Sequence, residues 1–442
     1  MRFRQVHLDF HTSGLIPEIG GRFDKAQFQK ALKLGHVNSI TVFSKCHHGW
    51  AYHPSTVNVT HPNLHFDLLG AELEACREID VNAPVYLSAG LDEKEVLEHP
   101  EWLNVSPYGV ETNTFTQPHY HLMCYNTPYL DKLAAQVEEV MQRYNPCGIF
   151  LDISDVRMCV CASCVKSMRE KGMDPQNMDD VKRHGEMVYA NYCHRMEQAV
   201  RKYSATATIF HNAGHIAHGR RDMADYDTHL ELESLPTGGW GYDHFPMSAA
   251  YVRTIGKDFL GMTGKFHTTW GEFGGFKHPN ALIYETGLSL ACGAAISIGD
   301  QMHPSGELNE STYRLIGRAY ELVERGYSSY RSYEIYETNP AIRKALEQLI
   351  DGTLCPEHPR MFQEIYHALL FGDGGGMADP YFVLKDLPQY MAAQKKIDGD
   401  YTDKDLWLRK AVLNTACSGG FSSDRTIREY NDKIWHLKPL NL

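Results

Sequence analysis

Eight short apolar segments rich in β-branched and aromatic residues recur along the first 300 residues, and segments with helical periodicity separate them. The predicted strands are 3–10, 39–44, 84–88, 148–153, 206–211, 229–235, 259–265 and 294–298. Strands that alternate with helices form parallel βαβ units, and eight such units favour closure into a barrel. We therefore expect an α/β fold in which residues 1–330 form a (β/α)8 barrel.

The pattern changes after residue 330. Serine- and tyrosine-rich sequence at 327–333 predicts a junction, and a glycine-rich tip lies at 372–376. Predicted helices follow at 340–351, 359–371, 387–396, 405–417 and 424–435. Residues 331–442 are thus expected to form a mostly helical second domain. An open doubly wound sheet is the alternative for the first domain, but no G-x-G-x-x-G follows its first strand.

Charge and cysteine content narrow the classes of partner. The formal net charge of −12 argues against nucleic acid, which needs a basic surface. The sequence shows neither a secretory signal nor an apolar run long enough to span a membrane, so we expect no membrane partner. Eleven cysteines, an odd number, are typical of reduced thiols and favour a cytoplasmic location.

Seven of the predicted strands end in carboxylates, imidazoles or indoles. Catalytic groups of (β/α)8 barrels lie at the C-terminal ends of the strands. One such residue is usually structural, but this many on one rim indicate a site. The residues concerned are His7, Asp9, His11, His47, His48, Trp50, Asp152, His211, Asn212, His215, Glu231, Glu233, His267, Trp270, Glu272 and Asp300.

This rim suits glycoside hydrolysis, which uses two carboxyl groups that flank the scissile bond. Asp152 ends an apolar strand and is the predicted nucleophile, whereas Glu233 and Glu272 both remain candidates for the acid/base. Glu231 lies on the same side of its strand as Glu233. The predicted sugar-binding residues are His11, His47, His48, Trp50, His211, Asn212, Glu231, His267, Trp270 and Asp300.

Two alternatives remain open. A metal-dependent hydrolase would also use a histidine-rich rim, and His7 and His11 resemble part of such a ligand set. We expect Asp9, between them, to point to the opposite side of its strand, which argues against that reading. The other alternative is an inactive barrel that binds sugar.

Three cysteines follow the fourth strand in a C-x-C-x2-C pattern, Cys159, Cys161 and Cys164. This spacing is suggestive of structural zinc. Cys124, Cys147 and Cys193 are candidates for a fourth ligand. Free thiols are the alternative interpretation.

Several segments resemble the barrel of family 151 glycoside hydrolases, at 7–13, 42–50, 231–236, 263–267 and 299–304. The resemblance implies a retaining α-L-fucosidase with a fucosylated oligosaccharide or glycoside as substrate and no required cofactor. The stretch 45–49 also resembles the fucose-binding segment of family 29 fucosidases, and Asp152 matches the nucleophile position of both. Family 151 members carry a trimerisation-type domain that we do not find here, so a homo-oligomer is left open.

The last hundred residues resemble a different enzyme. Segments 336–340, 380–386 and 418–430, with Ile434 and Trp435, are similar to the C-terminus of glycogen and α-glucan phosphorylases. The chain is thus expected to be a fusion of a fucosidase-like barrel with a phosphorylase fragment. Because the segment that carries pyridoxal phosphate in that family is not found, we expect neither this cofactor nor phosphorylase activity.

Overall fold

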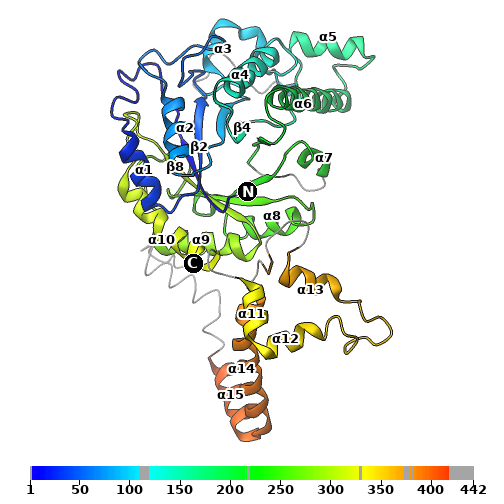
Figure 1. The fold of residues 1–442 in the computed structure, drawn as a ribbon. Coiled ribbons are helices and arrows are strands. Elements are labelled where there is room, and N and C mark those ends of the chain that lie inside the picture. Colours follow the sequence, from blue (N-terminus) through cyan, green and yellow to red (C-terminus); the bar gives the residue numbers. More distant parts are fainter. Residues whose placement is uncertain are drawn as a thin grey trace, which may run out of the picture. The chain divides into compact units, whose positions relative to one another are not determined.

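The computed structural model describes residues 2–108, 119–214, 216, 220–327, 331–372, 378–379 and 382–417. The chain divides into two compact units, Met1–Ser329 and Tyr330–Leu442 (Figure 1). The expected helix at 424–435 and the expected rim residue His215 lie outside the described residues.

Unit 1 is built on eight parallel strands in the order β5-β4-β3-β2-β1-β8-β7-β6. The strands are β1 (Arg4–Asp9), β2 (Ser39–Lys45), β3 (Val85–Ser88), β4 (Gly148–Asp152), β5 (Thr208–His211), β6 (Leu230–Glu233), β7 (Phe259–Gly264) and β8 (Ala295–Gln301). Edge strands β5 and β6 approach each other, because Thr228 N donates to Ile209 O at 2.9 Å and Glu233 N donates to Gly214 O at 3.1 Å. The sheet is a nearly closed barrel, which confirms the predicted (β/α)8 fold.

Helices lie around the barrel, and α10 contacts both α9 and α1 so that the ring of helices joins end to start. The helices of unit 1 are α1 (Lys25–Leu34), α2 (Leu68–Glu78), α3 (Glu93–Glu98), α4 (Tyr129–Tyr144), α5 (Ala162–Glu170), α6 (Met178–Arg201), α7 (Arg221–Ala224), α8 (His244–Val252), α9 (Pro279–Ala291) and α10 (Glu310–Tyr327), with 3-10 turns at Pro100–Trp102 and Pro236–Gly238. No helix within the described part of the chain is long and apolar enough to cross a membrane.

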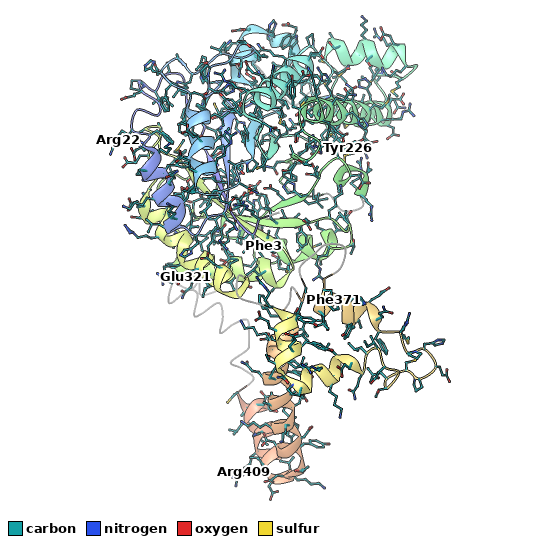
Figure 2. The ribbon with its side chains drawn as sticks, viewed as in Figure 1. Phe3, Arg22, Tyr226, Glu321, Phe371 and Arg409 are labelled. Carbon is teal, nitrogen blue, oxygen red and sulfur yellow. The ribbon has the colours of Figure 1, made fainter. Side chains whose placement is uncertain are left out.

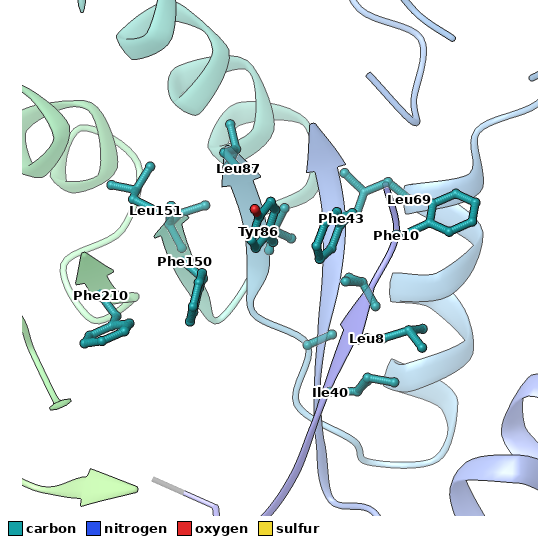
Figure 3. Close-up of a cluster of buried hydrophobic side chains, with 14 of the residues drawn as sticks. Leu8, Phe10, Ile40, Phe43, Leu69, Tyr86, Leu87, Phe150, Leu151 and Phe210 are labelled. Atoms are coloured by element: carbon teal, nitrogen blue, oxygen red, sulfur yellow. The ribbon is translucent and has the colours of Figure 1, made fainter. Parts of the chain in front are cut away.

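The barrel interior is filled by aromatic side chains from successive strands. Phe43 stacks on Tyr86 with ring centroids 3.7 Å apart, and Phe150 lies 5.6 Å from Tyr86 and 5.4 Å from Phe210 (Figure 3). These residues come from β2, β3, β4 and β5 in turn. Strands covered on both faces read as nearly continuous apolar runs, which is why the sequence pattern revealed them. This aromatic layer lies beneath the strand ends.

Unit 2 consists of helices α11 (Ser332–Thr338), α12 (Pro340–Glu347), α13 (Gln363–Leu370), α14 (Val383–Thr402) and α15 (Lys404–Ala416). Its small core contains Ile342, Leu346, Leu370 and Leu384. Helix α14 begins four residues before the predicted start, because the Asp379 carboxylate accepts hydrogen bonds from the first backbone N–H groups of the helix at 2.8 Å. Large apolar side chains on α14 and α15 are exposed within this unit (Figure 2).

Candidate active site

A cavity of about 340 Å³ opens at the C-terminal ends of the barrel strands. The size falls within the range of small-ligand sites, roughly 300–1,000 Å³. Carboxylates, imidazoles, an amide and aromatic rings surround it, from β1, β4, β6, β7 and the loops that follow the strands. The lining residues are His7, Asp9, His11, His47, Tyr120, Phe150, Asp152, Ile153, Asn212, Glu233, Met262, Trp270, Gly271 and Phe273.

Asp152 ends β4 and lies buried in this cavity with both carboxylate oxygens occupied. The Tyr86 hydroxyl donates to Oδ2 at 2.5 Å, and the Asn212 amide donates to Oδ1 at 2.8 Å. Burial, with a further contribution from the charge of Asp152, raises the pKa of Tyr86 well above its ordinary value. The phenol therefore stays a donor. Two such donors stabilise a carboxylate and fix the direction of its lone pairs.

The residue after Asp152 has an unusual backbone. Ile153 adopts a φ of +57°, although its branched side chain disfavours the left-handed region. The turn is held by neighbouring backbone groups, since Ala89 N and Gly90 N both donate to Asp152 O at 3.0 and 3.1 Å. A Cβ on Gly90 would lie 1.9 Å from Ile153 O, so this glycine permits the close approach. Strained conformations of this kind concentrate at functional sites.

Glu233 ends β6 and faces the same cavity. Trp270 Nε1 donates to its Oε1 at 2.7 Å. Burial raises the pKa of Glu233 to about 7, and the charge of Asp152 adds to the rise, while the Trp270 hydrogen bond opposes it. Two carboxyl groups thus share one cavity in different environments, one with two donors and one held protonated up to neutral pH.

Two imidazoles stack at the edge of the cavity near Asp152. The His11 and His47 ring centroids are 4.0 Å apart, and His11 Nε2 lies 2.9 Å from Asp9 Oδ1. Although burial opposes the charged form, Asp9 raises the pKa of His11 to about 10. Burial, reinforced by the charge of His11, lowers the pKa of His47 well below its usual value. A cationic and a neutral imidazole therefore lie side by side.

The expectation that Asp9 points away from His7 and His11 is wrong. All three side chains line the cavity. Residues two apart on a strand share a face, so the odd-numbered positions of β1 point the same way. Among the described residues, the groups of donors close enough to hold a metal ion are a cluster of four cysteines and the Glu95, Glu98 and His99 set, and neither lines the cavity.

Of the predicted site residues, the structure brings six to the lining of this cavity: Asp152, Glu233, His11, His47, Asn212 and Trp270. Glu272 is not among the lining residues. Its carboxylate instead accepts hydrogen bonds from Thr268 N and Oγ1, each at 2.7 Å, which lowers its pKa. His267 is exposed to solvent.

Other predicted sugar-binding residues lie behind or beside the cavity. Buried Glu231 lies below Glu233 on β6, with its Oε1 2.9 Å from His229 Nε2. His211 Nδ1 lies 3.0 Å from Asp227 Oδ1.

Three more of these predicted residues are also absent from the lining. Asp300 is buried with Lys265 Nζ 3.9 Å away. His48 Nε2 contacts the Tyr120 hydroxyl at 3.1 Å. Trp50 packs edge-on against His61, with ring centroids 5.8 Å apart.

The sequence places His7 and Asp9 at the rim without a sugar-binding or catalytic role, and it does not indicate Tyr86 or Tyr120. The period of two along a strand could have indicated Tyr86. It lies two residues before Ser88 on β3, so both side chains are on the same face of that strand. Ser88 Oγ in turn lies 2.7 Å from His47 Nδ1. Tyr120 lies between the 3-10 turn Pro100–Trp102 and α4, outside any strand or helix, where no periodic pattern indicates it.

Four cysteine sulfurs also come together in unit 1. The ligand atoms of Cys124, Cys159, Cys161 and Cys164 all lie within 4.8 Å of one another, and all four residues are buried. Of the three candidates for a fourth member of the C-x-C-x2-C group, the structure selects Cys124. These donors fit a soft metal ion.

Comparison with known proteins gives different relatives for the two parts of the chain. Residues 24–153 match the family described as hypothetical glycosyl hydrolase 6, and residues 291–437 match carbohydrate phosphorylase. The chain therefore contains segments that match two different families. The phosphorylase match begins ahead of β8, earlier than the motifs from residue 336 indicate.

The barrel is similar to the solved structure of α-L-fucosidase isoenzyme 2 from Paenibacillus thiaminolyticus, with 58% identity and a TM-score of 0.72. The alignment covers 73% of this chain and 49% of that one. A β-galactosidase from Marinomonas ef1 shares the fold at 12% identity and a TM-score of 0.54, covering 73% of this chain and 60% of that one. The matched family and this fucosidase structure are both those of glycoside hydrolases.

The phosphorylase relatives align with a short part of their length. Glycogen phosphorylase of Bacillus subtilis (strain 168) is 43% identical over 111 residues, which are 25% of this chain and 13% of that protein. Glycogen phosphorylase of Haemophilus influenzae is 29% identical over 160 residues, 35% of this chain and 19% of that protein. The chain thus spans about half of the fucosidase and less than a fifth of either phosphorylase.

Proposed function

We propose that unit 1 is a retaining α-L-fucosidase that cleaves terminal L-fucose from glycosides. The observation that carries this proposal is the pair of carboxyl groups, Asp152 and Glu233, in one cavity at the C-terminal end of the barrel. The 58% identity to an α-L-fucosidase over 73% of this chain supports the choice of sugar.

Asp152 is the proposed nucleophile. Its carboxylate is oriented by Tyr86 and Asn212, so that a lone pair is directed into the cavity and toward the anomeric carbon of a bound sugar. Attack would form a covalent glycosyl–enzyme ester and release the aglycone alcohol. Water would then cleave that ester and return the carboxylate.

Glu233 is the proposed acid/base. With a pKa of about 7, it is protonated at mildly acidic pH and can give its proton to the leaving oxygen. The resulting carboxylate can then deprotonate the water that attacks the ester. Glu272, the other candidate, lies outside the cavity lining and its pKa is lowered, which does not suit an acid.

The remaining cavity groups are suited to hold a sugar. Cationic His11 and neutral His47 offer hydrogen bonds to ring hydroxyls, and Trp270 and Phe273 offer apolar surface for the nonpolar face and methyl group of fucose. None of these steps uses a cofactor. A homo-oligomer and a cytoplasmic location remain further proposals from the sequence.

The test is a panel of aryl glycosides with three matched variants. Asp152→Asn is expected to lower kcat/KM for aryl α-L-fucoside at least about 1,000-fold, or about 4 kcal/mol, with the fold intact by circular dichroism. Glu233→Gln should lose most activity on substrates with poor leaving groups, and Glu272→Gln should stay near wild type.

Other outcomes distinguish the alternatives. A first-formed product with inverted anomeric configuration by NMR would contradict the retaining mechanism. Binding of fucose by calorimetry with no turnover of any glycoside would indicate the sugar-binding barrel. If Asp152→Asn keeps more than about a tenth of the wild-type rate, the lost transition-state stabilisation is less than about 1.4 kcal/mol. Asp152 would then not be the nucleophile.

A further inference from the structure

The four clustered cysteines have the spacing of a tetrahedral metal site. Cys124 Sγ lies 3.5 Å from Cys164 Sγ and 3.7 Å from Cys161 Sγ. A zinc ion bound by four thiolates at about 2.3 Å places neighbouring sulfurs about 3.8 Å apart. A disulfide would instead bring two sulfurs to about 2.05 Å. The cluster therefore matches a shared ion and not a pair of crosslinks.

The surroundings of the sulfurs also suit thiolates. Val105 N donates to Cys159 Sγ at 3.4 Å, and Asn126 Nδ2 donates to Cys164 Sγ at 3.6 Å. The Arg157 side chain lines the same small cavity as these two cysteines and Cys124, and its charge would partly offset that of the thiolates. Outer hydrogen bonds to metal ligands are a regular feature of metal sites.

We propose that Cys124, Cys159, Cys161 and Cys164 bind one Zn²⁺ that fixes two loops at the mouth of the catalytic cavity. Four thiolates in a tetrahedron select zinc among the common divalent ions. Because all four positions are filled by protein, no site is open for water or substrate, and the ion is structural.

The two loops are the ones that shape the cavity beside Asp152. Cys124 is four residues after Tyr120, which lines the cavity and lies with its ring 5.1 Å from His47. Cys159 and Cys161 belong to the loop that begins at Ile153, and Cys164 to the first turn of α5. Within the described residues the loops are also joined by the hydrogen bond from Val160 N to Val105 O at 2.9 Å. The ion would tie them together at a second point.

The first measurement is the metal content of the full-length protein, purified without added metal. We expect about one zinc per chain by plasma mass spectrometry. Cys161→Ser should lose it, and Cys147→Ser, at an exposed thiol outside the cluster, should retain it. Zinc below about a tenth of an equivalent in the wild type, or one equivalent of iron in its place, would overturn the proposal.

A second measurement needs no variant, in case Cys161→Ser does not fold. Titration of the native wild type with an organomercurial should release one zinc, detected with a chromogenic chelator, as the four thiols are modified. Thiol modification without zinc release would contradict the site.

The effect on the cavity rests on the proposed fucosidase activity and is read separately. Loss of zinc in Cys161→Ser is expected to raise KM for aryl fucoside more than it lowers kcat, whereas Cys147→Ser changes neither. Unchanged KM in zinc-free protein would refute the link to the cavity. Zinc in a protein without fucosidase activity would leave the metal site standing and reject only the function.

Discussion

The hydrogen bond from Trp270 to Glu233 allows a quantitative test of the proposed acid. Trp270 Nε1 donates to Glu233 Oε1 at 2.7 Å and favours the ionised carboxylate, whereas burial and the charge of Asp152 favour the protonated form. The balance raises the pKa of Glu233 to about 7. Since the acid must carry its proton, kcat/KM should be high below this pH and fall as the pH rises through it.

Trp270→Phe removes the donor and keeps an aromatic ring. A hydrogen bond to a charged group contributes about 1.5–3 kcal/mol, and one pKa unit corresponds to about 1.4 kcal/mol. Without the bond, ionisation of Glu233 becomes harder. The alkaline limb of the profile should therefore move about one to two pH units higher.

The assay is kcat/KM for an aryl α-L-fucoside with a poor leaving group, measured from pH 5 to 10. Trp50→Phe is the matched control, because Trp50 lies outside the cavity lining. The alkaline limb of the pH profile of this variant should stay near pH 7. A limb in Trp270→Phe that does not move, or moves to lower pH, would refute the reasoning. Glu233→Gln should lack the limb altogether.

Three further predictions follow from the same geometry. Gly90→Ala should lower kcat about 100-fold, because its Cβ would meet Ile153 O at 1.9 Å and displace the backbone beside the nucleophile. Gly287→Ala, with open space around its Cβ, is the control and should leave the kinetics unchanged. Tyr86→Phe should lower kcat about 10–100-fold with little change in melting temperature, because Asp152 loses one of its two donors; an unchanged rate would show that the phenol is dispensable. Hydrogen exchange by mass spectrometry should be faster in unit 2 than in the barrel, because α14 and α15 expose most of their apolar side chains within that unit; equally slow exchange in both would contradict this.

The barrel could be predicted from sequence because each strand is covered on both faces. β2 and β4 are buried along their whole length, and a continuous apolar run between helices has few other interpretations. The residues at which strands end are harder to predict than the strands themselves. β8 continues to Gln301, three residues beyond the predicted end, because the polar residues at its C-terminal end still pair with β1.

The site could be predicted only in part, since loops decide which rim residues reach the cavity. Asp152 and Glu233 end their strands, so the strand itself positions them. Trp270 and Glu272 are two residues apart on one loop, yet only Trp270 turns into the cavity. The choice depends on local bonds such as that from Thr268 to Glu272, which no periodicity encodes. For the same reason, the sequence left the fourth cysteine of the cluster undecided among Cys124, Cys147 and Cys193.

The division of labour between the two carboxyl groups depends on their neighbours and not on their own chemistry. Asp152 has two donors, and one of them is a phenol whose pKa burial raises so far that it stays protonated. Glu233 has the Trp270 donor and lies beside the charge of Asp152. Since that charge contributes to the raised pKa of Glu233, the protonation of Glu233 depends on the neighbouring Asp152 carboxylate. Removal of that charge in Asp152→Asn should therefore lower the pKa of Glu233. If the pKa of Glu233 stayed near 7 in Asp152→Asn, measured by NMR of the Glu233 carboxyl carbon, the charge of Asp152 would not be acting on Glu233.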